Sequence, residues 1–279
     1  MNNTIGMLIL SMSLSGTVPA DTTIPADGTP APYDTIQTEA FEETASEETA
    51  LKSLGLSEDE IFALIVRKNN SVTNTLGYDV IKDADVLNYD YDIASYTTYY
   101  SQGASNENRN YNMLLASDSI NGVILRPGEE FSYNDVILSK RTPERDYKAA
   151  GVISGGKLVN ATGGGICQIS TTLFNAALHS GMTITQRRNH SLKVGYVPAG
   201  MDATCSWGTI DFCFRNDLEV PVKIESVMKD GAIKVRFLAP CDPGIGNIEL
   251  KVANNNGTYT LNRYVDGVVD YTTTSRYRG

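Results

Sequence analysis

The sequence is poor in the residues that usually bind metals and in the cysteines that cross-link small folds. Its 279 residues include four cysteines, two histidines and one tryptophan, and no two cysteines stand at CxxC spacing. Cysteine pairs at that spacing are common zinc ligands, so a structural zinc site is not expected. Four cysteines are also too few to form a disulfide scaffold in a chain of this length. We expect neither a metal ion nor a cofactor.

An excess of basic residues is also missing. The net charge is −10, and residues 21–60 hold 11 of the 33 acidic residues but only one of the 23 basic residues. Residues 1–20 hold neither kind, so residues 61–279 hold 22 of each. No basic footprint for nucleic acid exists, and we expect no nucleic-acid partner. The segment 21–50, with its excess of acidic residues, is typical of a disordered, solvated linker.

Residues 1–20 resemble a signal peptide. An apolar stretch from Ile5 ends in the small residues before Asp21, although no Lys or Arg precedes it. The stretch is short for a full membrane span. We therefore expect an exported protein, located outside the cell or in the cell wall, with membrane anchoring through the N-terminus as an open alternative.

The hydrophobic pattern predicts an α+β fold, with a central helix beginning at a cysteine and mostly antiparallel strands in the second half. Residues 51–93 are expected to form a helical or mixed N-terminal region, and residues 94–241 the main domain. Within that domain, 109–121 reads as a helix, and 229–231 (Lys-Asp-Gly) reads as a hairpin turn. Residues 242–279 are predicted to be a short β-hairpin extension.

The most informative segment joins three glycines to a cysteine. Gly163, Gly164 and Gly165 lead into Ile166-Cys167-Gln168, where apolar residues at helical spacing begin and continue to about Ser180. A thiol at a helix N-terminus is favoured as thiolate, and glycine N–H groups can face a developing oxyanion. The placement suggests a nucleophile. The alternative is a small, buried cysteine after a flexible loop.

A nucleophilic cysteine needs a base, and the chain has only two histidines. His179 lies three turns along the helix that Cys167 begins, so it is remote from the thiol. His190 lies beyond that helix and reaches Cys167 only if the chain folds back, which Gly181 permits. The third group that orients an imidazole would come from Asp202, Ser191 or a backbone carbonyl.

Other signatures of enzyme classes are absent. The sequence has no phosphate loop, no GxSxG elbow and no HExxH motif. Arg187 and Arg188 are adjacent, so in a strand they would face opposite sides, and one of them could bind a substrate carboxylate.

Six spaced motifs resemble the VanW domain, and the likeness covers roughly residues 95–240. The motifs occur in this order: Pro127-Gly-Glu-Glu-Phe-Ser-Tyr-Asn134, Gly163-Gly-Gly-Ile-Cys-Gln-Ile-Ser-Thr-Thr-Leu-Phe-Asn175, Arg188-Asn-His-Ser191, Tyr196-Val-Pro-Ala-Gly200, Asp202-Ala-Thr204 and Asp211-Phe-Cys-Phe-Arg-Asn216. Two cysteines depart from the pattern expected of the family: Cys205 replaces an apolar residue, and Cys213 has no known functional counterpart.

The resemblance implies a cysteine-dependent L,D-transpeptidase that forms 3–3 cross-links in peptidoglycan. Carried over, Cys167 would be the nucleophile and His190 the general base and then the acid. The turn at Gly163 and Gly164, with the N–H groups of Gly165, Cys167 and Gln168, would hold the oxyanion.

The same resemblance implies that peptidoglycan stem peptides are the donor and acceptor. Arg188 would meet a stem carboxylate, and Ser191 and Asp202 would lie at the binding site or orient the base. Two alternatives stay open: a non-catalytic peptidoglycan-binding accessory module of the kind associated with glycopeptide resistance, and a cysteine peptidase or carboxypeptidase acting on stem peptides.

Overall fold

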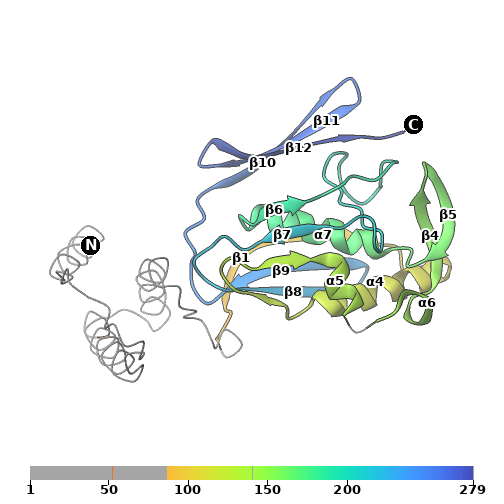
Figure 1. Cartoon of the computed structure of the whole chain (residues 1–279), viewed down its shortest axis with the longest axis horizontal. Coiled ribbons are helices and arrows are strands. Elements are labelled where there is room, and N and C mark those ends of the chain that lie inside the picture. The colour runs from red at the N-terminus through yellow and green to blue at the C-terminus, as the bar shows by residue number, and fades with distance from the viewer. Residues whose placement is uncertain (1–51, 53–86, 140, 279) are drawn as a thin grey trace, which may run out of the picture. The chain divides into compact units, whose positions relative to one another are not determined.

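The computed structural model describes residue 52, residues 87–139 and residues 141–278. The expected signal segment, the acidic linker and most of the predicted N-terminal helical region lie outside the described residues. The described part is α+β and rich in antiparallel sheet, as the sequence predicts (Figure 1). None of its helices is long and apolar enough to cross a membrane.

The main sheet has four antiparallel strands in the order β1-β9-β8-β2. These are β1 (Tyr91–Tyr99), β9 (Ala232–Ala239), β8 (Val222–Lys229) and β2 (Ile124–Leu125). The turn between β8 and β9 is the one predicted from Lys-Asp-Gly. Asp230 and Gly231 both have positive φ, at 51° and 77°, which a two-residue type I′ turn requires.

Two long helices pack with this sheet. Helix α4 (Glu107–Ile120) contains the predicted helical segment and contacts β8, whereas α7 (Ile166–His179) lies against β1, β9 and α4. Twelve of the fourteen α7 residues are buried, so the helix forms the centre of the core rather than a surface layer. The described residues also include three short helices: η2 (Ala104–Asn106), α5 (Tyr133–Leu138) and α6 (Pro143–Asp146).

A second sheet covers the other side of α7. It has the order β3-β7-β6, from Glu130–Ser132, Cys213–Arg215 and Thr183–Gln186. Phe212 and Phe214 are fully buried; the ring of Phe212 meets Phe174 of α7 edge-on at 5.6 Å, and that of Phe214 meets Phe237 of β9 at 5.5 Å. Such pairs contribute about 0.5–1.5 kcal/mol each beyond their buried area. They fix the position of α7 between the two sheets.

A separate hairpin, not predicted from the sequence, is formed by β4 (Ala149–Ser154) and β5 (Lys157–Thr162). It has mainly exposed side chains, so it lacks the alternation that marks a half-buried strand. The Gly155-Gly156 turn, with φ of 59° and 82°, was its best sequence signal. The hairpin ends at Thr162, directly before the glycine turn.

The C-terminal extension has strands at the three places where the sequence alternates. Strands β10 (Ile248–Asn255), β11 (Thr258–Val265) and β12 (Val268–Arg276) form a three-stranded antiparallel sheet. Arg263 joins it to the core, because its buried guanidinium donates to the carbonyls of Leu178 and Met182 at 3.2 and 2.8 Å. These carbonyls lie at the C-terminal end of α7, where backbone acceptors are left without helical partners.

Candidate active site

The glycine turn places Cys167 in the first turn of α7. Gly165 is the N-cap residue, with φ 109° and ψ −29°, a conformation that few other residues adopt. Asn112 of α4 holds the turn, since its side-chain amide donates to the carbonyls of Gly164 and Lys148 at 3.0 and 2.8 Å. The half-buried thiol therefore sits at the positive end of the helix dipole.

Close packing explains why the turn is made of glycine. A Cβ at Gly164 would lie 2.5 Å from the carbonyl carbon of Ala150, and one at Gly165 would lie 2.9 Å from the carbonyl oxygen of Arg109. A Cβ at Gly163 would collide with the ring of Trp207. Backbone atoms and a large ring have little freedom to move aside, so these glycines are required by the approach of neighbouring segments.

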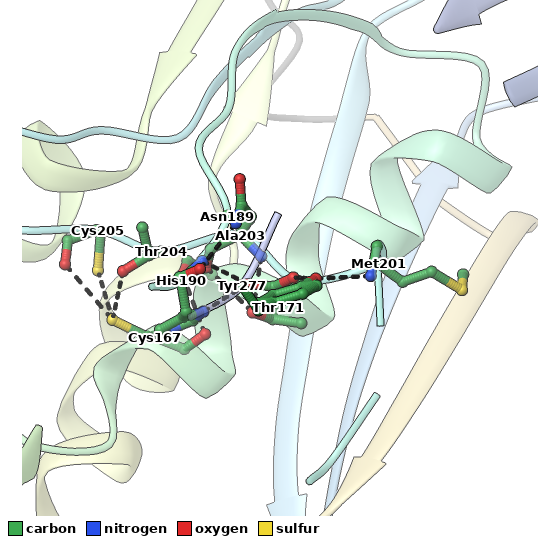
Figure 2. Close-up of polar contacts among 12 residues, drawn as sticks. Cys167, Thr171, Asn189, His190, Met201, Ala203, Thr204, Cys205 and Tyr277 are labelled. Atoms are coloured by element: carbon green, nitrogen blue, oxygen red, sulfur yellow. Dashed lines mark hydrogen bonds and ion pairs between the residues drawn. The ribbon is translucent and has the colours of Figure 1, made fainter. Parts of the chain in front are cut away.

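The chain after α7 does return to the thiol. Strand β6 leads to His190, whose imidazole comes close enough to the Cys167 sulfur to lower the pKa of the thiol. The return is stabilised by a second segment that runs beside it: Thr204 N–H donates to the carbonyl of Arg188 at 2.8 Å. Figure 2 shows His190 near Cys167, with Thr204 and Cys205 on the other side of the sulfur.

Asp202 lies behind His190. Its Oδ2 is 2.7 Å from Nδ1 of the imidazole and also accepts the backbone N–H of His190 at 2.6 Å. Asp202 is fully buried and His190 is 5% exposed, so this pair is shielded from water. A carboxylate at Nδ1 orients the other ring nitrogen toward the thiol, as in the Cys–His and Ser–His arrangements of acyl-transfer enzymes.

Helix α7 itself holds the segment that carries Asp202. The Thr171 hydroxyl and the backbone of Ala203 exchange two hydrogen bonds of 3.0 Å, and Asn175 donates to the Met201 carbonyl at 2.8 Å. Figure 2 shows Thr171 of the helix close to Ala203. The thiol and the carboxylate are therefore positioned by the same rigid element.

The charges of the pair are set by these contacts. The hydrogen bond from the Cys205 thiol is the largest cause that holds the pKa of Cys167 well below its ordinary value; the imidazole of His190 acts in the same direction, and burial opposes both. Burial would lower the pKa of His190, but the Asp202 carboxylate and the Cys167 sulfur raise it to about 9. These contacts favour the thiolate form of Cys167 and the imidazolium form of His190.

Cys205 is closer to the site than the sequence indicates. Its sulfur lies 3.6 Å from the Cys167 sulfur, and Oγ1 of Thr204 lies 3.7 Å from the same Cys167 sulfur. The hydrogen bond to Cys167 is the main reason that the pKa of Cys205 is raised well above normal, and burial and the charge of the Cys167 sulfur act in the same direction, so Cys205 stays a thiol and donates. None of the four cysteines, all of which lie in the part of the chain that the structure describes, forms a disulfide.

The thiol opens into a cleft of about 960 Å³. One wall is the β4–β5 hairpin, and the other consists of the segments after β6 and after β12. The volume suits a peptide of a few residues. Arg188 is exposed on the wall of this cleft, whereas its neighbour Arg187 is buried and donates to the Asp202 carbonyl at 2.8 Å.

Two of the other candidate residues have structural contacts. Gln168 is 1% exposed, and its backbone N–H donates to the Gly165 carbonyl at 2.9 Å, so this N–H is not available to an oxyanion. The N–H groups of Gly165 and Cys167 have no acceptor among the described residues.

Ser191 supports the cleft wall, since its hydroxyl accepts from Gly156 N–H at 3.2 Å. His179 stacks on Tyr96 at 6.1 Å, at the far end of α7.

Sequence reasoning missed three contributors to the site. Arg109 of α4 reaches Gln168 beside the thiol, Tyr277 hydrogen bonds to Asp202, and Cys205 donates to Cys167. The first two are distant in sequence and lie in segments without a motif. Cys205 departs from the pattern expected of the family, and this departure was the sequence signal that could have pointed to its place at the site.

The half-buried thiol of Cys167 lies at the N-terminus of a core helix, with the buried His190–Asp202 pair behind it and a peptide-sized cleft in front of it. The class is therefore an α+β protein with a Cys–His–Asp arrangement, the geometry that thiol nucleophiles use. The protein is VanW-like. Residues 108–238 match the family described as VanW like protein, which confirms the resemblance given by the motifs.

Two curated relatives support this assignment. Uncharacterized protein YoaR of Bacillus subtilis (strain 168) is 41% identical over 141 residues, which cover 50% of this chain and 46% of YoaR. Vancomycin B-type resistance protein VanW of Enterococcus faecalis is 34% identical over 177 residues, which cover 61% of this chain and 62% of that protein. The chain thus spans less than two thirds of the length of either relative. No solved structure matches.

Proposed function

We propose that the protein is an exported cysteine acyltransferase of the cell wall, an L,D-transpeptidase that forms 3–3 cross-links between peptidoglycan stem peptides. The observation that carries the proposal is the Cys167 thiolate paired with a His190 imidazolium whose other nitrogen is held by Asp202. This arrangement supplies a nucleophile and a proton donor in one cleft.

In the first half-reaction, the Cys167 thiolate attacks the carbonyl carbon of the donor's third residue. The N–H groups of Gly165 and Cys167 are placed to stabilise the oxyanion that forms. The oxyanion collapses, the amide C–N bond breaks, and His190 gives its proton to the departing amine. A thioester remains on Cys167, and the free D-alanine leaves.

In the second half-reaction, the side-chain amine of an acceptor stem replaces the leaving group. Neutral His190 takes a proton from that amine as its nitrogen attacks the thioester carbonyl. The C–S bond then breaks and regenerates the thiolate, and His190 is again an imidazolium. The product is one new amide bond between two third residues, and the enzyme returns to its initial state.

The relatives give independent support for a place in the cell wall. The protein of Enterococcus faecalis is named a vancomycin B-type resistance protein, and vancomycin-type glycopeptides act on peptidoglycan stems. We extend an association with glycopeptide resistance to this protein on that basis. Export, suggested by residues 1–20, is part of the same proposal, because the substrate lies outside the membrane.

Intact-mass spectrometry of the purified protein with tetrapeptide-bearing muropeptides tests the proposal. A covalent adduct equal to the donor minus alanine is expected on the wild-type protein, and a 3–3 dimer is expected when an acceptor is added. Cys167→Ala should give neither product. Cys213→Ala is the matched control, because Cys213 is a buried thiol on β7 and does not line the cleft.

Other products would point to the alternative functions. Tripeptides without dimers would indicate a carboxypeptidase, in which water replaces the acceptor amine. Saturable binding without any covalent adduct would indicate a peptidoglycan-binding accessory module, and the transpeptidase proposal would then be wrong.

A further inference from the structure

The cleft around Cys167 has an unbalanced charge. Five basic side chains line it, and no Asp or Glu is among the described residues of its lining, although the whole chain carries a net charge of −10. The five are Arg109, Arg188, Lys193, Arg276 and Arg278. A cleft lined by charges of one sign favours a ligand with charge of the opposite sign. The ligand that fits is therefore anionic.

Arg109 occupies a special place among the five. It extends from α4 with its stem against Gly165, so it lies beside the turn that carries the thiol. Its guanidinium donates to Oε1 of Gln168 at 2.8 Å and contacts the sulfur of Met113 at 3.0 Å. Both partners are uncharged. Within the part of the chain that the structure describes, Arg109 has no carboxylate partner.

The guanidinium is also held in one orientation. The Gln168 amide group donates to the carbonyl of Tyr99 at 2.9 Å and to Oγ1 of Thr98 at 3.2 Å, which leaves its oxygen facing Arg109. A guanidinium has five N–H donors, so donors remain for a ligand after these contacts. A fixed, partly desolvated guanidinium without an acid is suited to bidentate binding of a carboxylate.

The position relative to the thiol identifies which carboxylate. Arg109 contacts Gly165 and Gln168, which lie on either side of Cys167 in the chain. Burial lowers the pKa of Arg109, whereas Tyr196 and then Cys167 raise it. When the last peptide bond of a chain is attacked, the attacked carbonyl and the terminal carboxylate belong to neighbouring residues. The Cα atoms of neighbouring residues are ~3.8 Å apart. A carboxylate at Arg109 therefore belongs to the residue directly after the bond that is cleaved.

We propose that Arg109 is a specificity-determining residue that binds the terminal carboxylate of the leaving amino acid, so that the site accepts only the last peptide bond of a chain with a free C-terminus. The inference rests on the proposed function and names the part of the donor that the site reads. It also explains why a cleft that holds several residues would release a single amino acid.

Calorimetric titration of Cys167→Ala with two donors tests this inference without any reaction. The donors are a tetrapeptide stem with a free C-terminal carboxylate and the same stem with a C-terminal carboxamide. Arg109 is intact in this background, and the carboxylate is expected to bind about ten- to hundredfold more tightly, as expected for a charge-assisted hydrogen bond. Adding Arg109→Gln should remove the preference and leave binding of the carboxamide unchanged.

Arg145→Gln is the matched control, because Arg145 is an exposed arginine of α6 outside the cleft. It should keep the full preference, which separates a local contact from a general loss of positive charge. Equal binding of the two donors to Cys167→Ala would overturn the inference. So would a preference that survives Arg109→Gln, or an equal loss of binding for both donors.

A reactive experiment keeps this outcome separate from the proposed function. If thioester forms equally well on the carboxylate and the carboxamide donor, the transpeptidase proposal stands and the role of Arg109 is wrong. If the carboxylate preference is seen in binding but no thioester forms, the role of Arg109 stands and the transpeptidase proposal is wrong.

Discussion

Tyr277 donates a hydrogen bond through its hydroxyl to Oδ1 of Asp202, which lies 75 positions earlier in the chain. The same hydroxyl accepts the backbone N–H of Gly200 at 2.6 Å. Tyr277 follows β12 and lies beyond residues 108–238, the part that matches the VanW family. The C-terminal sheet thus ends in a contact with the carboxylate that orients His190.

Tyr277→Phe should therefore weaken the fold around the site. The change leaves the Gly200 N–H without its partner and removes one of two partners of Asp202 Oδ1, which keeps Arg187 at 3.6 Å, so the free energy of unfolding should fall by about 1–3 kcal/mol. Tyr259→Phe is the control, because Tyr259 packs on Tyr277 with ring centroids 5.6 Å apart and has no hydroxyl partner among the described residues. It should cost less than about 0.5 kcal/mol. Equal losses in urea denaturation would contradict the role of the hydroxyl.

The thiolate of Cys167 should be present at a pH where an ordinary thiol is protonated. The rate of alkylation by iodoacetamide, followed against pH, should titrate with a midpoint well below 9. His190→Gln removes the imidazolium and its hydrogen bond, so the midpoint should move upward. His179→Gln, which removes an imidazole at the far end of α7, should leave the midpoint unchanged.

The upper limb of the activity profile follows from His190. The neutral imidazole cannot protonate the leaving amine, and the pKa of His190 is about 9. Donor cleavage should therefore be constant between the titration midpoint of Cys167 and the pKa of His190, and decline as the pH rises through the pKa of His190. The measurement is the rate of thioester formation in single-turnover reactions. A decline centred near 6.5, the ordinary histidine value, would show that Asp202 and Cys167 do not stabilise the imidazolium.

Cys205 should lower the pKa of its neighbour through its thiol proton. Cys205→Ala removes the donor, so the alkylation midpoint of Cys167 should rise, whereas Cys205→Ser retains a hydroxyl donor and should restore much of the effect. Cys213→Ala again serves as the control for loss of a buried thiol. A midpoint that is the same in Cys205→Ala and in the wild-type protein would exclude this role.

The parts of the fold that follow from short-range chemistry were predictable. Glycine at a positive φ ends one segment and begins another, so Gly165 before a periodic apolar run indicates where α7 begins. Lys-Asp-Gly between alternating residues likewise indicates the β8–β9 turn. In both cases the signal lies within a few residues of the structure that it specifies.

The assembly of the site was less predictable, because it depends on contacts between distant segments. His190 reaches Cys167 because Thr171 and Asn175 of α7 bind the backbone of the segment 201–203, and no periodicity marks that contact. From the sequence alone, a polar residue inside a helix is equally consistent with a position on the protein surface. Arg109 illustrates the same limit, since its importance comes from having no acidic partner among the described residues, which only the folded chain reveals.

The glycine turn offers a test of packing that does not involve conformational strain. Gly164 has an ordinary φ, but a Cβ there would lie 2.5–2.7 Å from backbone atoms of Ala150 and Gly151 on β4. Gly164→Ala should therefore reduce the free energy of unfolding by about 1–3 kcal/mol, because the strand must shift to relieve the overlap. Gly195→Ala is the matched control: Gly195 has no positive φ, and nothing lies within 4 Å of its Cβ position. Its cost should stay within about 0.5 kcal/mol. Urea denaturation of both variants measures the difference, and equal stabilities would show that the β4–β5 hairpin is not packed against the turn in solution.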